Sequence, residues 1–212
     1  MALPVPTREL GHSIGAAGPS AVHLAAFLDY VCPYSCKFYK TMRREVLPHY
    51  KGKDLKFTFH HQVQPWHPQS TITHEAGLAV GKLGGEDAFW CFSDALYERQ
   101  ADFFDENVWG MTRPQVAAAL AKIADSAAGV PAFELERMLG MQLVEVHGPN
   151  PGSYVTQDLK FAVKYARQLG VHVSPTTTLN GLVFDSNSAW GLHKWAGVLD
   201  PLLESALSRV DA

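Results

Sequence analysis

The side chain of this sequence that says most about function is a cysteine at the junction of an expected strand and an expected helix. Cys32 follows the mostly apolar run 21–31 and directly precedes Pro33, a residue that is favoured in the first turn of a helix. Unpaired N–H groups and a partial positive charge at a helix N-terminus both stabilise an anion. A thiolate at Cys32 is therefore expected to have a lowered pKa and to act as a nucleophile. The alternative is a buried structural cysteine that merely precedes a helix.

The residues after Cys32 bring a hydroxyl and a second thiol close to it. The sequence reads Cys32-Pro33-Tyr34-Ser35-Cys36. A hydrogen bond from Ser35 would lower the pKa of the thiol further, and Tyr34 would supply an apolar wall. Four helical steps cover about 6 Å, near the upper limit of the Cα separation in a disulfide. A bond between Cys32 and Cys36 would be strained and easily reduced; otherwise Cys36 packs against the sheet.

Three more residues are candidates for the same site. Asp29 ends the apolar run three residues before Cys32. Desolvation there would raise its pKa and make it a proton acceptor or relay; otherwise it caps the turn. Trp66 and His67 follow a second expected strand and would lie at the same edge of the sheet as Cys32. We expect them to line the substrate groove, with a packed loop as the alternative.

Neither the last cysteine nor the other histidines predict another site. Cys91 lies in the aromatic helical segment 89–92 and is expected to be inert core. The chain has ten histidines, but those between residues 60 and 74 match no zinc-binding spacing. His60 and His61 also point to opposite faces of a strand. We therefore expect no metal ion and no bound cofactor.

The pattern of apolar residues indicates an α/β fold. The run 21–31 predicts a strand buried on both faces, as in a central parallel sheet. A helix is expected over 34–48, closed by its proline, and residues 55–63 alternate as in a strand. These elements would place Cys32 between a strand and a helix.

A second group of elements is expected near the end of the chain. Thr156 would cap a helix that ends at Gly170. Asn180-Gly181 between two short apolar runs, 176–179 and 182–184, is a strong hairpin signal. A last helix is expected over 189–208 and would bend at its internal proline.

Between these two groups the sequence predicts only helices. They occupy residues 70–146, and a loop rich in Gly and Pro follows them. We interpret this stretch as an all-helical insertion. Residues 1–69 and 147–212 would then form one domain, and 70–146 the inserted subdomain.

Composition excludes several classes of function. The chain has 212 residues, with 18 Lys and Arg against 21 Asp and Glu, and a formal net charge of −3. Without a basic stripe, nucleic-acid binding is not expected, and no apolar run of about eighteen residues would span a membrane. Residues 1–10 make a poor secretory signal. Three cysteines are too few for disulfide bonds to stabilise a chain of this size. We expect a reducing, cytoplasmic setting.

The chain resembles the thioredoxin superfamily, and within it the DsbA-like branch, whose helical domain is inserted into the thioredoxin fold. The resemblance rests on the segment Asp29-Tyr30-Val31-Cys32-Pro33-Tyr34 at a strand end, on the helical insertion, and on residues 170–176 before a later strand. It covers about residues 20–208. Such a fold is α/β, thioredoxin-like, with an inserted all-helical subdomain.

The resemblance implies a function and further site residues. Members of this branch are thiol-disulfide oxidoreductases, and protein thiols or disulfides are their partners. The bond between Ser174 and Pro175 would be a cis peptide packed against the Cys32 thiol. The backbone before Pro175 would pair with the bound partner like an added strand, and Pro33 and Tyr34 would contact the substrate.

One departure from the family motif changes the expected mechanism. The family has Cys-x-x-Cys, whereas Ser35 stands here at the place of the resolving cysteine and Cys36 is displaced by one residue. Efficient dithiol exchange is therefore not expected. A single thiolate at Cys32 would instead form a mixed disulfide with glutathione or a protein thiol, which glutathione or Cys36 then resolves.

Two other functions remain open at this point. Kappa-class glutathione transferases and their isomerase relatives share the helical insertion and have a Ser-Pro-Tyr-Ser-like element at the same place. A transferase or isomerase of that kind would bind glutathione without redox turnover at Cys32. A non-catalytic thioredoxin-fold binding module would have an ordinary thiol and no affinity for glutathione.

Overall fold

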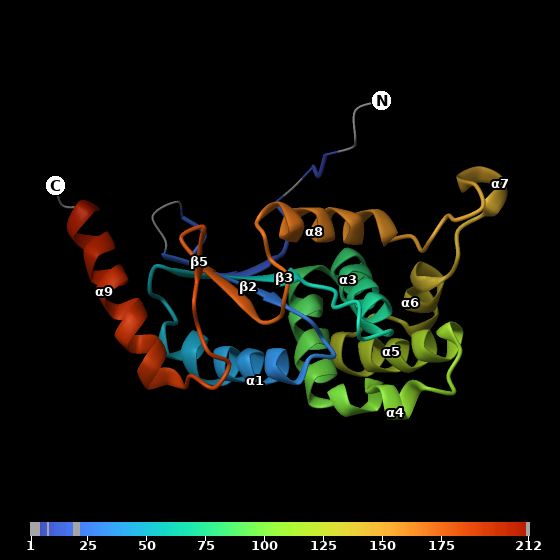
Figure 1. The fold of residues 1–212 in the computed structure, drawn as a ribbon, viewed down its shortest axis with the longest axis horizontal. Coiled ribbons are helices and arrows are strands. Elements are labelled where there is room, and N and C mark those ends of the chain that lie inside the picture. Colours follow the sequence, from blue (N-terminus) through green and yellow to red (C-terminus); the bar gives the residue numbers. More distant parts are fainter. Residues whose placement is uncertain (1–4, 8, 19–21, 211–212) are drawn as a thin grey trace.

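A five-stranded mixed sheet forms the centre of the molecule (Figure 1). The computed structural model describes residues 5–7, 9–18 and 22–210, with residues 206–210 described by their backbone alone. The strand order is β1-β3-β2-β4-β5. The strands β2 and β3 pair in parallel and the other neighbours pair antiparallel. The bounds are His12–Gly15 (β1), Val22–Leu28 (β2), Leu55–His61 (β3), Thr176–Leu179 (β4) and Leu182–Phe184 (β5).

The two parallel strands lie at the centre because their residues are almost all apolar or buried. Strand β2 is shorter than the run 21–31, since it ends at Leu28 and a turn leads from there to Cys32. Ala21, the first residue of that run, lies outside the described residues. The hairpin of β4 and β5 has the predicted bounds. Its turn residue Asn180 has a φ of 48°, in the left-handed region that Asn tolerates.

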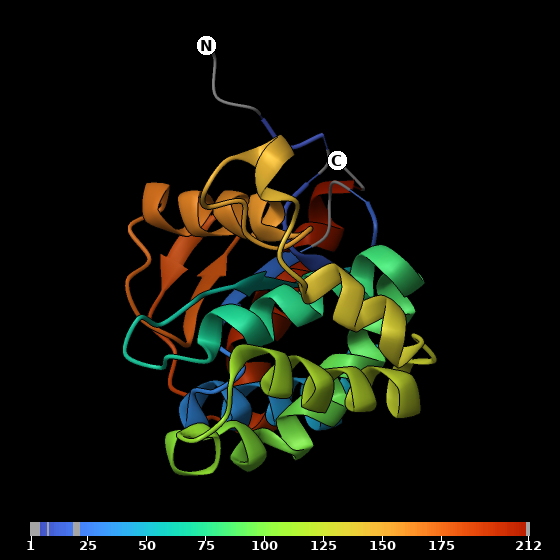
Figure 2. The ribbon, with the colours of Figure 1, turned by 90° about the vertical axis from the view of Figure 1, so that its right-hand side faces the viewer.

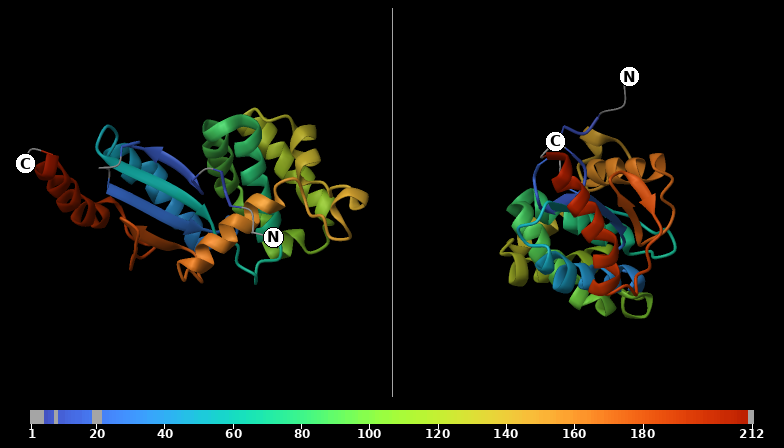
Figure 3. Two further views of the ribbon diagram at one scale, coloured as in Figure 1. Left: turned by 90° about the horizontal axis from the view of Figure 1, so that it is seen from above. Right: turned by 90° about the vertical axis from the view of Figure 1, so that its left-hand side faces the viewer.

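Helices cover both faces of the sheet (Figures 1 and 3). Helix α1 (Pro33–Thr41) continues through a π-helical turn, Met42–Val46, into α2 (Leu47–His49). Helix α8 (Thr156–Gln168) lies on the opposite face from α1 and contacts β3. Thr156 is the first helical residue and Val155 the N-cap, so the expected cap was wrong by one position. Helix α9 (Leu192–Val210) begins three residues later than expected.

The residues between β3 and α8 form a separate group of helices beside the sheet (Figure 2). The longest of them, α3, breaks at Gly85, whose φ of 80° and ψ of −171° are not helical. An α/β fold with inserted helices is thus confirmed. The bounds are Ser70–Glu98 (α3), Asp105–Val108 (α4), Arg113–Ala128 (α5), Ala132–Leu139 (α6) and Val144–His147 (α7), with a 3-10 turn at Gln100–Phe103.

The inserted helices hold the turn that follows β2. The side-chain amide of Gln100 donates to the carbonyl oxygens of Tyr30 at 2.8 Å and of Cys32 at 2.9 Å. The Tyr30 hydroxyl bonds the hydroxyl of Ser93 in α3 at 2.7 Å. These buried contacts fix the backbone on which the candidate nucleophile stands. Within the described part of the chain, no helix is long and apolar enough to cross a bilayer.

Candidate active site

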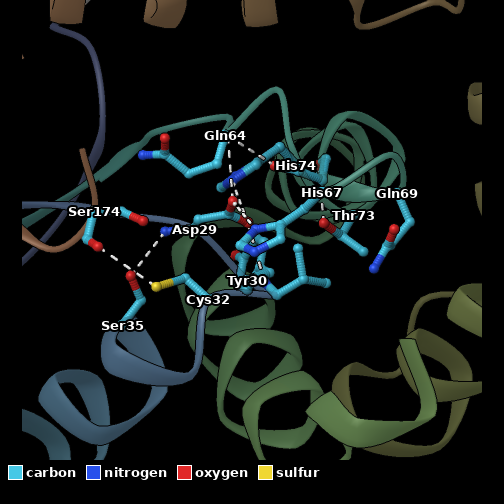
Figure 4. Close-up of polar contacts among 12 residues, drawn as sticks. Asp29, Tyr30, Cys32, Ser35, Gln64, His67, Gln69, Thr73, His74 and Ser174 are labelled. Carbon is cyan, nitrogen blue, oxygen red and sulfur yellow. Dashed lines mark hydrogen bonds and ion pairs between the residues drawn. The ribbon is translucent and has the colours of Figure 1, made fainter. Parts of the chain in front are cut away.

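Cys32 lies at the N-terminus of α1 and faces the loop before β4 (Figure 4). It is the N-cap residue, with a φ of −81° and a ψ of 120°, and Pro33 begins the helix. Its sulfur donates a 3.4 Å hydrogen bond to the carbonyl oxygen of Ser174. The peptide bond between Ser174 and Pro175 is cis. Pairing of β4 with β2 brings these two distant segments together, because Thr176 lies opposite Phe27.

The residues after Pro33 differ from the expectation that they would contact the thiol. The side chain of Tyr34 is 67% exposed and is therefore largely open to solvent. Ser35 is fully buried, and its hydroxyl oxygen accepts a 3.2 Å hydrogen bond from the backbone N–H of Asp29. The Ser35 hydroxyl therefore ties α1 to the end of β2.

The second thiol of α1 faces a different neighbour. Cys36 is half-buried and its sulfur donates a 3.4 Å hydrogen bond to the carbonyl oxygen of Tyr97 in α3. Burial raises the pKa of Cys36 against the opposing effect of Lys40. Cys32 and Cys36 are both free thiols, with hydrogen-bond acceptors in different segments.

Cys91 is not buried, although its aromatic neighbours in the sequence suggest a core position. Cys91 is exposed on α3, so the expectation of an inert core residue was wrong. Its neighbours Phe89, Trp90 and Phe92 are buried. A helix turns by about 100° per residue. Residues 89, 90 and 92 therefore lie on one face, which is buried, and residue 91 lies on the opposite face.

Asp29 is a buried carboxylate that accepts several hydrogen bonds. It accepts from the backbone N–H of Val31 at 3.0 Å and of Gln64 at 3.2 Å, and Nδ1 of His67 lies 3.1 Å from Oδ2. Burial alone would raise the pKa of Asp29, but the bonds from His74, Val31 and His67 together hold it below its ordinary value. The expected rise in pKa was therefore wrong. Its bond to Val31 caps the turn, which was the alternative interpretation.

Two buried histidines extend this network into the interior. Nε2 of His74 lies 3.5 Å from Oδ1 of Asp29, and Nδ1 of His74 lies 2.8 Å from Nδ1 of His61. Burial, and next the neighbouring His74, lower the pKa of His61 well below its ordinary value.

Trp66 and His67 are neighbours that differ in exposure. Trp66 is 59% exposed, and its ring centre lies 6.1 Å from that of His67. His67 helps to line a pocket of about 340 Å³. Two further lining residues, Val31 and Pro33, flank Cys32 in the sequence. The pocket is completed by Gln69, Phe104, Asp105 and Glu106.

Several residues of this arrangement carry no signal in the sequence. Gln64, Gln100 and His74 hold the turn or its carboxylate, yet each lies in a segment whose pattern indicates only structure. Their roles depend on contacts between distant segments. Among the described residues, no three His, Cys, Asp or Glu side chains gather in a way that could hold a metal ion.

Comparisons with known proteins find the fold in solved structures. No family model matches the sequence, and no curated protein matches it. A proposed protein-disulfide isomerase from Pseudomonas syringae superposes with a TM-score of 0.69 and 26% identity, covering 89% of this chain and 97% of that one. BdbD from Bacillus subtilis, in its oxidised form, has a TM-score of 0.67 and 18% identity over 92% and 93% of the two chains.

A third solved structure has the same fold. A periplasmic thioredoxin-like protein from Salmonella enterica serovar Typhimurium has a TM-score of 0.61 and 17% identity, over 92% of this chain and 90% of that one. These matches span both the sheet and the helical insertion. They show that the chain has a thioredoxin-like fold of the DsbA type, with the thiol of Cys32 at the N-terminus of α1.

Proposed function

We propose that this protein is a thiol-disulfide oxidoreductase in which Cys32 alone attacks the substrate. The observation that carries the proposal is the placement of the thiols. Cys32 stands at the N-terminus of α1 beside Ser174, whereas the sulfur of Cys36 is bonded to Tyr97 in another segment. The position of a family resolving cysteine holds Ser35, whose hydroxyl oxygen is engaged by the backbone of Asp29.

The position of Cys32 at the N-terminus of α1 suits the thiolate that attacks a disulfide. No acidic residue stands in the first turn of α1. The free N–H groups of that turn and the helix dipole stabilise a thiolate. A substrate that displaces the Cys32 sulfur from Ser174 would break the hydrogen bond in which the thiol donates its proton. The neutral thiol would then lose that stabilisation.

The reaction requires two exchanges. The Cys32 thiolate attacks one sulfur of a disulfide, a new sulfur–sulfur bond forms, and the other sulfur leaves as a thiolate. A second thiol then attacks the mixed disulfide and returns Cys32 as a thiolate. Because Cys36 is half-buried and its pKa is raised by burial, we assign this second step to an external thiol, either glutathione or a protein thiol.

The matched structures support the class of reaction. The Pseudomonas syringae protein is a proposed protein-disulfide isomerase, and the Bacillus subtilis structure is that of an oxidised protein. Protein thiols and disulfides are the substrate class that we propose on this basis. The role of glutathione as co-substrate rests on the chemistry of a single thiol, which needs a partner to complete its cycle.

A kinetic comparison of cysteine variants tests the proposal. Steady-state reduction of a small disulfide by glutathione would be measured in a Cys91→Ser background, so that the exposed thiol does not contribute. Cys32→Ser is expected to abolish turnover, and Cys36→Ser to retain it. Loss of turnover in Cys36→Ser would contradict the single-thiol mechanism. Glutathione transfer to an electrophile that persists in Cys32→Ser would favour the kappa-like alternative.

A further inference from the structure

We propose that His67, oriented by Asp29, is the acid–base residue of this site and protonates the thiolate that leaves when Cys32 attacks a disulfide. The inference rests on the proposed function and names a catalytic group for it. Figure 4 shows the main chain of Asp29 bonded to Ser35 and its carboxylate reaching toward His67.

The pairing of His67 with Asp29 fixes which ring nitrogen is free. Oδ2 of Asp29 lies 3.1 Å from Nδ1 of His67. Asp29 is completely buried, and it also accepts backbone N–H groups from Val31 and Gln64. An ionised carboxylate can only accept hydrogen bonds, so the Nδ1 atom of His67 carries a proton. Nε2 of His67 is then the atom available for proton exchange, as in a histidine held by a catalytic aspartate.

His67 reaches solvent and shares a pocket with the two chain neighbours of the nucleophile. Its side chain is 21% exposed, while that of Asp29 is buried. It lines the same pocket as Val31 and Pro33, the two neighbours of Cys32 in the chain. In the proposed complex, the near sulfur of the disulfide meets Cys32 and the far sulfur points toward this pocket and its imidazole.

The charged and titratable groups around His67 come from several elements. Asp29 follows β2, and Cys32 precedes α1. Asp105 and Glu106, in α4, line the same pocket. His74, in α3, lies against the other oxygen of Asp29. His67 is the one basic side chain among the described residues that line this pocket.

Protons and electrons balance over the two exchanges. In the first, the electron pair of the broken sulfur–sulfur bond leaves on the far sulfur, and protonated His67 gives that thiolate its Nε2 proton. In the second, neutral His67 takes a proton from the incoming thiol, whose thiolate attacks the mixed disulfide and releases the Cys32 thiolate. The net reaction converts one disulfide and one thiol into another disulfide and another thiol, with no further oxidant.

The test uses two uncharged disulfides whose leaving thiols differ in acidity. Mixed-disulfide formation on Cys32 would be timed in a single turnover, with a pyridyl disulfide and with hydroxyethyl disulfide. The pyridyl leaving group is stable as an anion and needs no acid, whereas the alkyl thiolate does. His67→Gln is expected to slow the alkyl reaction by about 100-fold and the pyridyl reaction by less than about threefold. Added imidazole should restore only the alkyl rate in His67→Ala.

The control and the contradicting results are distinct. His193→Gln, an exposed histidine of α9, should leave both rates unchanged. An equal loss of both rates in His67→Gln would overturn the inference, because the residue would then only shape the pocket. If the unaltered protein reacts with neither disulfide, the proposed function itself fails and this inference with it.

Discussion

The sulfur of Cys32 lies 3.4 Å from the carbonyl oxygen of Ser174, a residue 142 positions later in the chain. Two opposing influences meet at this thiol. The carbonyl accepts the thiol proton and so stabilises the neutral form, while the N-terminus of α1 stabilises the thiolate. A substrate that binds against this loop would displace the carbonyl and leave the thiolate as the favoured form.

The first prediction concerns the buried hydroxyl of Ser35. Ser35→Ala leaves the backbone N–H of Asp29 without its acceptor, which should lower the free energy of unfolding by about 1–3 kcal/mol. The pH dependence of Cys32 alkylation should stay unchanged, since the hydroxyl is directed at Asp29. Chemical denaturation and alkylation rates check the two parts. Ser126→Ala, at an exposed helical position, is the matched control for stability; a raised pKa of Cys32 in Ser35→Ala would show that Ser35 acts on the thiolate.

The second prediction concerns the buried carboxylate. Asp29→Asn keeps the shape of the side chain but places an amide NH2 group against N–H donors from Val31, Gln64 or His67. The free energy of unfolding should fall by about 2–4 kcal/mol, measured by urea denaturation. The exposed Asp102→Asn should cost less than about 1 kcal/mol, because its ion pair with Arg99 is at the surface. Equal small costs for both variants would mean that the Asp29 network contributes little to stability.

The third prediction is a loss of stability in acid that originates in buried histidines. Burial, and next the neighbouring His23, lower the pKa of His60 from 6.5 to about 3. Between these values the unfolded chain binds one more proton at this site than the folded chain. The free energy of unfolding should therefore fall by about 1.4 kcal/mol per pH unit as the pH drops through this window, and His61 adds in the same direction.

Denaturation curves measured across that pH range check this prediction. His60→Phe retains an aromatic ring against Phe27 and Tyr165 and should flatten the dependence on pH. His49→Gln, at an exposed position, should leave the dependence as it is. The same slope in His60→Phe as in the unaltered protein would assign the acid sensitivity to other groups.

The fourth prediction ranks the two thiols that do not react with substrate. In Cys32→Ser, iodoacetamide should modify Cys91 faster than Cys36, because Cys91 is exposed while burial raises the pKa of Cys36. Mass spectrometry of peptides from the native, labelled protein measures both rates. Faster modification of Cys36 would mean that α1 and α3 separate more readily than their contact at Tyr97 implies.

Much of the fold follows from local sequence. The hairpin around Asn180-Gly181 was predicted to the residue, because the turn requires a residue that tolerates positive φ and its neighbours form short apolar runs. The break of α3 at Gly85 also has a local cause, because glycine adopts a positive φ without steric cost. The position of Cys32 at the N-terminus of α1 was also predictable, because an apolar run ends there and a helical pattern with a proline begins.

The details of the site depend on contacts that local sequence does not contain. The pKa of Asp29 is lowered because donors arrive from His67 and His74, which stand in other segments. Burial without those donors would give the opposite direction, which is what the sequence suggests. Ser35 is a similar case, since its hydroxyl bonds the backbone of Asp29 at the end of β2 and not the thiol of Cys32.

The most direct test of the central claim is the intact mass of the Cys91→Ser protein after exposure to oxidised glutathione. A single nucleophilic thiol at Cys32 should give one glutathione adduct, located at Cys32 by peptide mapping and missing when Cys32→Ser is added. Loss of two hydrogens without an adduct would contradict it, because that product is a disulfide between Cys32 and Cys36.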